Sequence, residues 1–70
     1  MLKEKIAELQ LSHSEIARRA GIKQPYLTQL INGARNNPSI FTIVGIANAL
    51  QLKPTEVFDV FVSNITEKIN

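Results

Sequence analysis

A chain of 70 residues is the size of one small domain, here 1–70, and 44% hydrophobic with 20% charged residues is a globular composition. The absence of cysteine and the single histidine exclude a disulfide scaffold, a thiolate zinc site and a multi-histidine metal site, so we expect neither metal nor cofactor. The net charge is +2, but residues 11–39 hold four lysines or arginines against one glutamate, whereas residues 54–70 hold one lysine against three acidic residues.

The spacing of apolar residues predicts helices throughout and no strand. Leu2, Ile6 and Leu9 lie at the spacing of a first short helix. Ser12 and Glu15 then match a capping box, in which the Ser12 hydroxyl accepts from the Glu15 amide and the Glu15 side chain returns to the Ser12 amide. A second helix is therefore expected to begin at this point.

The second helix is expected over roughly 13–20, with Gly21 as its C-terminal glycine. The segment 21–23 then forms a three-residue turn into a third helix, roughly 24–32, which ends at Asn32-Gly33. Two short helices joined in this way have the geometry of a helix-turn-helix.

The rest of the chain predicts a loop and two more helices. Residues 34–38 form the loop, and Ser39 caps a fourth helix over roughly 40–50. Pro54 lies in the first turn of a fifth helix that extends to about Ile69. The core side of the fourth helix is expected to consist of Ile40, Ile43, Ile46, Ala47 and Leu50. The fold class is therefore all-α, with five helices and short connections.

Residues 11–58 resemble the Cro and phage-repressor family of helix-turn-helix domains. The resemblance is carried by Leu11-Ser12, Ile16-Ala17, Ala20-Gly21-Ile22, Leu27, Leu30, Asn32-Gly33, Pro38-Ser39, Ile46-Ala47, Ala49-Leu50 and Val57-Phe58. It implies a lambda-repressor-like domain with a core over 1–58, in which the second helix of the helix-turn-helix enters the major groove of DNA. It also implies a transcription regulator rather than an enzyme.

The third helix has one apolar and one polar side. The apolar arc holds Tyr26, Leu27, Leu30 and Ile31, and the opposite arc holds Gln24, Pro25, Thr28, Gln29 and Asn32. The polar arc has no acidic group, and a glutamine carboxamide matches adenine N6 and N7. A neutral polar side is also common on solvent-exposed helices. Together with the resemblance, the pattern predicts that DNA bases are read by Gln24, Pro25, Thr28 and Gln29.

Two residues near the starts of these helices are candidates for phosphate contacts. Lys23 stands where an N-cap serine or threonine is expected, and its charge opposes the helix dipole, so we hypothesise that it serves an ionic contact. A tolerated surface lysine is the alternative. His13 opens the second helix, where the family commonly has a glutamine that contacts a phosphate.

Arg18 and Arg19 are adjacent and about 100° apart on the helix, so they cannot both face DNA.

Four further residues are candidates for phosphate contacts. The resemblance implies such a contact at Asn32, and Arg35 just beyond it can reach a phosphate or the minor groove. The loop from Gly33 is one residue longer than the family's commonest form, so Asn36 competes with Arg35 for this role. Tyr26 lies at the edge of the apolar arc, where its hydroxyl can reach a phosphate, with core packing as the alternative.

A second apolar surface is expected where the resemblance ends, in the C-terminal extension 59–70. The apolar arc of the fifth helix holds Val57, Phe58, Phe61, Val62, Ile65 and Ile69, which is more than a small core readily buries. Phe41 lies off the core arc beside Gly45, which permits a close partner. We predict a two-fold homodimer through Phe41, Gly45, Val57, Phe58, Phe61, Val62 and Ile65. In the alternative, the fifth helix folds back and covers Phe41 within one chain.

The sequence thus predicts a regulator of transcription, most simply a repressor, that binds double-stranded DNA at a near-palindromic operator as a homodimer. No apolar run approaches the ~20 residues that cross a bilayer, so we expect a cytoplasmic, nucleoid-associated protein with no membrane partner. The alternative is an antitoxin or protein-interaction module whose apolar surface binds a toxin or antirepressor. A steep fall of DNA affinity with salt would distinguish the two functions.

Overall fold

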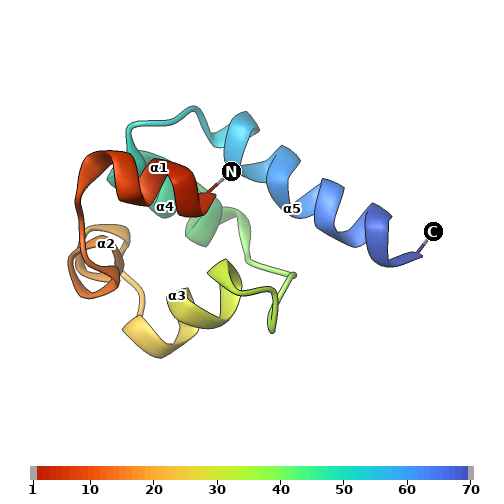
Figure 1. The fold of residues 1–70 in the computed structure, drawn as a ribbon, viewed down its shortest axis with the longest axis horizontal. Helices are drawn as coiled ribbons and strands as arrows, with labels where there is room; N and C mark the ends of the chain where they lie inside the picture. Colours follow the sequence, from red (N-terminus) through yellow and green to blue (C-terminus); the bar gives the residue numbers. More distant parts are fainter. Residues whose placement is uncertain (1, 70) are drawn as a thin grey trace.

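The computed structural model describes the backbone of residues 2–69 and the side chains of residues 2–66. The described chain is helical and contains no strand, which confirms the all-α prediction. Its five helices are α1 (Leu2–Leu9), α2 (His13–Ala20), α3 (Gln24–Ile31), α4 (Ile40–Leu50) and α5 (Pro54–Ile69). The last turns of α5 project from the body formed by the other helices and lengthen the molecule, which measures 34 × 21 × 21 Å (Figure 1).

Short polar side chains begin the helices, as the sequence predicts. Ser12 Oγ accepts from the Glu15 amide at 3.1 Å, and Ser39 Oγ accepts from the Thr42 amide at 3.2 Å. The second half of the predicted capping box at α2 is wrong, because the Glu15 carboxylate accepts from two arginines of its own helix. A carboxylate does return in that manner at α5, where Glu56 accepts from the Lys53 amide at 3.0 Å.

The ends of α2 and α4 have the same geometry with different residues. Gly21 closes α2 at φ 75°, and the next amide, that of Ile22, donates to the Ala17 carbonyl at 3.0 Å. Gln51 closes α4 at φ 59°, and the Leu52 amide donates to the Ala47 carbonyl at 2.9 Å. The sequence predicts the first end from its glycine. It also predicts that α4 ends at about residue 50, but not the left-handed conformation of Gln51.

α4 lies at the centre of the fold, in contact with α1, α2 and α5. The largest fully buried side chains are Ile16, Leu27, Leu30, Ile46, Leu50 and Val57. The prediction that Ile40 belongs to the core is wrong, because this first residue of α4 is 75% exposed. Thr42 is buried instead, and its hydroxyl is satisfied by a 3.1 Å hydrogen bond from Ser39 Oγ.

Gly45 allows α4 to pack closely on the end of α2. A Cβ atom on Gly45 would lie 2.5 Å from the Ala20 carbonyl oxygen and 3.2 Å from its carbonyl carbon. The close approach that this glycine permits is therefore made within one chain. A partner is therefore not needed to explain this glycine, and its place in a dimer interface stays a prediction.

The apolar arc of α5 is divided between the core and the surface. Val57 and Phe61 are 0% and 3% exposed, so they pack inside this chain, and their predicted place in a dimer interface is wrong. Phe58, Val62 and Ile65 remain exposed, whereas the side chain of Ile69 lies outside the described residues. Phe41 is 89% exposed, so the alternative in which the fifth helix covers it is also wrong. Among the described residues, no helix is long and apolar enough to cross a membrane.

Candidate nucleic-acid interface

The turn between α2 and α3 fixes which side of α3 faces outward. Leu27 and Leu30 are 1% and 2% exposed and anchor the inner side of the helix in the core. The opposite side lies along one edge of the molecule (Figure 1). On that side Gln24, Pro25 and Gln29 are exposed and Thr28 is half-buried. The predicted division of α3 into an apolar inner side and a polar outer side is confirmed.

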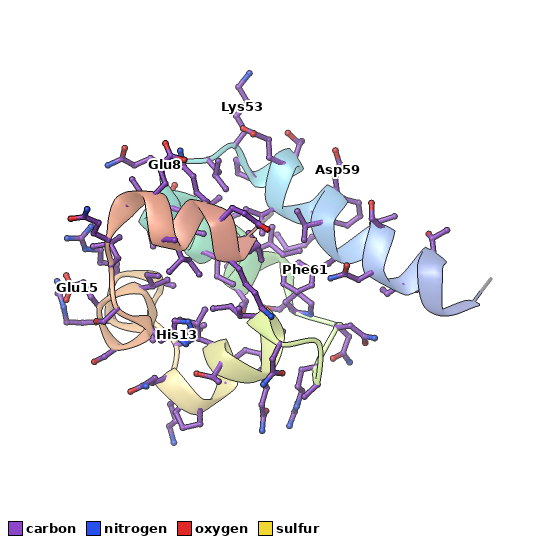
Figure 2. The ribbon with its side chains drawn as sticks, in the orientation of Figure 1. Glu8, His13, Glu15, Lys53, Asp59 and Phe61 are labelled. Carbon is purple, nitrogen blue, oxygen red and sulfur yellow. The ribbon has the colours of Figure 1, made fainter. Side chains whose placement is uncertain are left out.

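His13 links the start of α2 to the middle of α3. Its ring lies between the two helices (Figure 2), and its Nδ1 atom is 3.2 Å from the Thr28 hydroxyl oxygen. The bond holds the Thr28 side chain in one position and uses one of its hydrogen-bonding directions. Sequence reasoning placed both residues in the site but missed their contact, since a separation of 15 positions carries no periodic signal.

Lys23 is the N-cap residue of α3, as predicted, and its side chain makes no capping hydrogen bond. The residue is exposed in an extended backbone conformation at φ −79° and ψ 144°. Its ammonium group therefore stays available beside a helix N-terminus, whose first amides have no partner within the helix. Both features favour the approach of an anion.

The loop after α3 folds back on that helix. The Arg35 amide donates to the Gln29 carbonyl at 3.0 Å, and the Arg35 guanidinium lies over the Tyr26 ring with Cζ 5.7 Å from the ring centre. Tyr26 is half-buried and packs against the core, which agrees with the alternative prediction of core packing. Arg35 is exposed and Asn36 is half-buried, so Arg35 has the freer side chain of the two.

Asn32 shapes the turn that leads into this loop. Its Oδ1 atom accepts from the Ala34 amide at 3.0 Å, and the next residue, Gly33, takes a positive φ of 85°. The side-chain oxygen is thus used locally, while the residue itself is exposed. The Nδ2 group retains its donors for an acceptor such as a phosphate oxygen.

Arg18 and Arg19 both bind the carboxylate of Glu15 on the outside of α2. Arg18 Nε donates to Glu15 at 3.1 Å and Arg19 Nε donates at 2.8 Å. These bonds, that of Arg18 foremost, lower the pKa of Glu15 from 4.5 to about 2. The spacing of three and four positions could have indicated this cluster from the sequence. Its net charge is one positive unit, which is less than two free arginines would carry.

The site thus has an outer row of amide and hydroxyl groups with cations beside it. Its members on α3 include no carboxylate, and the one carboxylate of α2 is neutralised by two arginines. The described residues hold no group of three histidine, aspartate or glutamate side chains that could bind a metal ion. The row is suited to hydrogen bonds with neutral donors and acceptors next to a polyanion.

Comparison with known proteins gives one match. A family model described as helix-turn-helix matches residues 2–57, which span α1 to α4 and the start of α5. The comparisons with curated proteins and with solved structures give no match. The matched segment covers most of the part that resembles the Cro and phage-repressor domains.

Proposed function

This chain belongs to the Cro and phage-repressor type of helix-turn-helix family, the DNA-binding transcription regulators, and from that premise we propose that it is a repressor. It acts at the nucleoid, in the cytoplasm, where it binds a near-palindromic operator as a homodimer and excludes polymerase from the DNA. The observation that carries the proposal is the outer side of α3, which is polar, uncharged and held outward by two buried leucines.

The dimensions of α3 fit the major groove. An α-helix with its side chains is about 10–12 Å across, which matches the groove's width of ~12 Å, and the 8 residues of α3 form about two turns. Gln24, Pro25 and Gln29 are exposed along it, and each glutamine offers a donor and an acceptor to adenine. A well-formed contact of this kind discriminates between bases by ~1–3 kcal/mol.

Thr28 and His13 act together in this proposal. The Thr28 hydroxyl donates to His13 Nδ1 across the 3.2 Å contact, and its oxygen then accepts from the amino group of adenine or cytosine. When Nδ1 accepts, the proton of the neutral ring is on Nε2, which donates to a backbone phosphate. The base contact and the phosphate contact are thereby fixed relative to each other.

The remaining polar residues position the domain on the DNA backbone. Lys23 contacts a phosphate near the start of α3, and Arg35 contacts another from its place over Tyr26. Asn32 donates through Nδ2, because its oxygen is already bound to a backbone amide. Asn36 and the Tyr26 hydroxyl complete the set at its edge. None of these contacts reads the base sequence directly.

Repression from a near-palindromic operator requires two copies with their α3 helices about one turn, ~34 Å, apart on the DNA. Support for a second copy comes from the start of α4, where Phe41 is 89% exposed. Other large apolar side chains of α4 and α5 are exposed as well, and an apolar patch of this kind, unlike a single exposed residue, marks an interaction surface. The acidic C-terminal helix repels the DNA backbone, which has the same charge, so DNA is expected to approach the basic middle of the chain.

Selection of bound sites from random duplex DNA, followed by titration at several salt concentrations, tests the proposal. We expect an enriched two-fold sequence and a steep fall of affinity with salt. Plotted as the logarithm of the binding constant against the logarithm of the salt concentration, the data give a slope. Lys23→Ala should reduce the size of this salt slope by about one for each Lys23 that contacts a phosphate. Lys53→Ala is the matched control, since Lys53 lies at the opposite edge of the molecule from α3 (Figure 2).

Two results would reject the function. One is a selection that returns no sequence preference, and the other is equal salt slopes for the Lys23 and Lys53 variants. Binding of a toxin-like protein in place of DNA would favour the antitoxin alternative. The exposed apolar side chains of α4 and α5 are the surface on which such a partner would be expected.

A further inference from the structure

Among the described side chains, α4 and α5 together expose six large apolar ones, which we call the α4–α5 face. They are Ile40, Phe41, Val44, Phe58, Val62 and Ile65. Three come from the start of α4 and three follow one another along α5 at positions typical of one helix side. The two helices pack against each other, so the six side chains belong to adjoining surfaces.

An apolar groove lies within this face. Its volume is about 200 Å³, its surface is entirely apolar, and it is lined by Ile40, Ile43, Val44, Pro54, Thr55 and Phe58. Phe41 is not part of the lining. It follows Ile40 in the chain, lies one helical turn before Val44, and is 89% exposed, so it projects beside the groove and not into it.

The two charged side chains of α5 that the structure describes, Glu56 and Asp59, lie on a different side of that helix. Glu56 and Asp59 line a separate hollow with Val60, Ser63 and Asn64. Figure 2 shows Asp59 pointing away from the body and Phe61 pointing into it. α4 itself contains no charged residue. A partner that covers the apolar groove therefore does not have to desolvate a charge of α4.

We infer that a second copy of this chain occupies the groove, with Phe41 of each protomer inserted into the groove of its partner. A two-fold interface requires one surface that is complementary to itself. The α4–α5 face meets this requirement because it carries both a projecting aromatic side chain and an adjoining apolar groove large enough for such a ring. The inference rests on the proposed homodimer and specifies how its two copies recognise each other.

The arrangement has a consequence that a general apolar contact would lack. Phe41→Ala removes the inserted ring and leaves the groove intact, whereas Val44→Glu blocks the groove and leaves the ring. A dimer of either variant retains no insertion. A mixed dimer retains one, because Phe41 of the Val44→Glu chain can enter the groove of the Phe41→Ala chain.

Sedimentation equilibrium on the full chain measures this directly. We expect the wild type to dimerise and each variant to raise the dissociation constant by at least about tenfold. An equimolar mixture should associate more strongly than either variant alone. Both substituted positions are exposed, so thermal melting of dilute samples should show unchanged monomer stability. An unchanged dimer in Phe41→Ala, or no gain in the mixture, would overturn the inference.

Gln29→Ala separates this inference from the proposed function, since Gln29 is exposed on α3 and does not line the groove. It should weaken DNA binding and leave the dissociation constant of the dimer unchanged. A wild-type monomer that still selects a DNA sequence would refute the homodimer and its reciprocal docking and leave sequence-specific DNA binding intact. A chain that dimerises through Phe41 and shows no preference among DNA sequences would refute the repressor and leave the docking intact.

Discussion

α3 and α4 are each anchored by buried leucine or isoleucine side chains, yet their outer sides have opposite chemistry. The exposed residues of α3 include Gln24 and Gln29, whose carboxamides are well solvated until another polar surface replaces the water. α4 instead exposes Ile40 and Phe41, which water solvates poorly. Binding to the first surface is therefore expected to depend on salt and on base sequence, whereas binding to the second is expected to depend on shape and apolar area.

The largest effect should come from the side chains that hold each outer surface in place. Leu27 is 1% exposed and fixes α3 to the core, so Leu27→Ala should lower the free energy of unfolding by ~2–5 kcal/mol. Phe41→Ala removes a larger but exposed side chain and should change it by no more than ~0.5 kcal/mol. Urea unfolding at concentrations where the protein is monomeric measures both. Comparable losses would mean that Phe41 is packed within the single chain.

Gly45→Ala should have the next largest effect on the free energy of unfolding. It tests whether the glycine is needed for the fold of one chain or for a partner. The added Cβ would lie 2.5 Å from the backbone oxygen of Ala20, which cannot move without shifting α2. We expect a loss of ~1–3 kcal/mol in the free energy of unfolding despite the better helix propensity of alanine. Asn48→Ala, at an exposed position of the same helix, should instead be neutral or slightly stabilising. Thermal unfolding distinguishes the two variants.

The two surfaces also differ in how far the sequence predicted them. α3 has apolar residues on one side only, so periodicity alone indicated that Leu27 faces inward and Gln29 outward. α4 and α5 are apolar on more than one side, and periodicity does not say which side meets the core. The apolar pattern therefore predicts Phe61 in an interface with a partner although it is buried. It predicts Ile40 in the core although it is exposed.

Contacts between distant residues explain the rest of the difference. Ser12, Ser39 and Gly21 act on their own helix ends, so local chemistry predicted the bounds of those helices. Gly45 meets Ala20 across the fold, and that contact depends on how α4 crosses α2. Residues that act locally were predictable, whereas those that act through tertiary packing required the structure.

Thr28→Val tests the polar surface with little change in shape. The substitution removes the hydroxyl that contacts His13 Nδ1 at 3.2 Å and that we propose as the base acceptor. We expect DNA affinity to fall by ~1–3 kcal/mol and the free energy of unfolding to fall by ~1 kcal/mol. Thr66→Val is the matched control on α5 and should leave DNA affinity unchanged, as measured by fluorescence anisotropy. An unaltered affinity in Thr28→Val would exclude its role in base reading.

The smallest effect concerns pH and separates the two surfaces by charge. Arg18 and Arg19 lower the pKa of Glu15 to about 2, below the 4.5 of the free side chain. Because the folded-state pKa is depressed, the ionised carboxylate stabilises the fold above pH 4.5, and this contribution is lost as the pH falls towards 2. Glu15 lies at the surface, so the contribution is modest and screened by salt.

Glu15→Gln should therefore reduce stability slightly at pH 7 and flatten the decline of stability between pH 5 and 2, as measured by urea unfolding across that range. The same variant should leave self-association unchanged. Glu15 lies on α2, whereas the apolar groove is lined by uncharged residues of α4 and α5. A change in the dissociation constant of the dimer would show that the charged side of α2 and the α4–α5 face are coupled. Without such coupling, a change in the charge of α2 would affect the proposed binding to DNA. The proposed contact between two copies would depend on apolar packing alone.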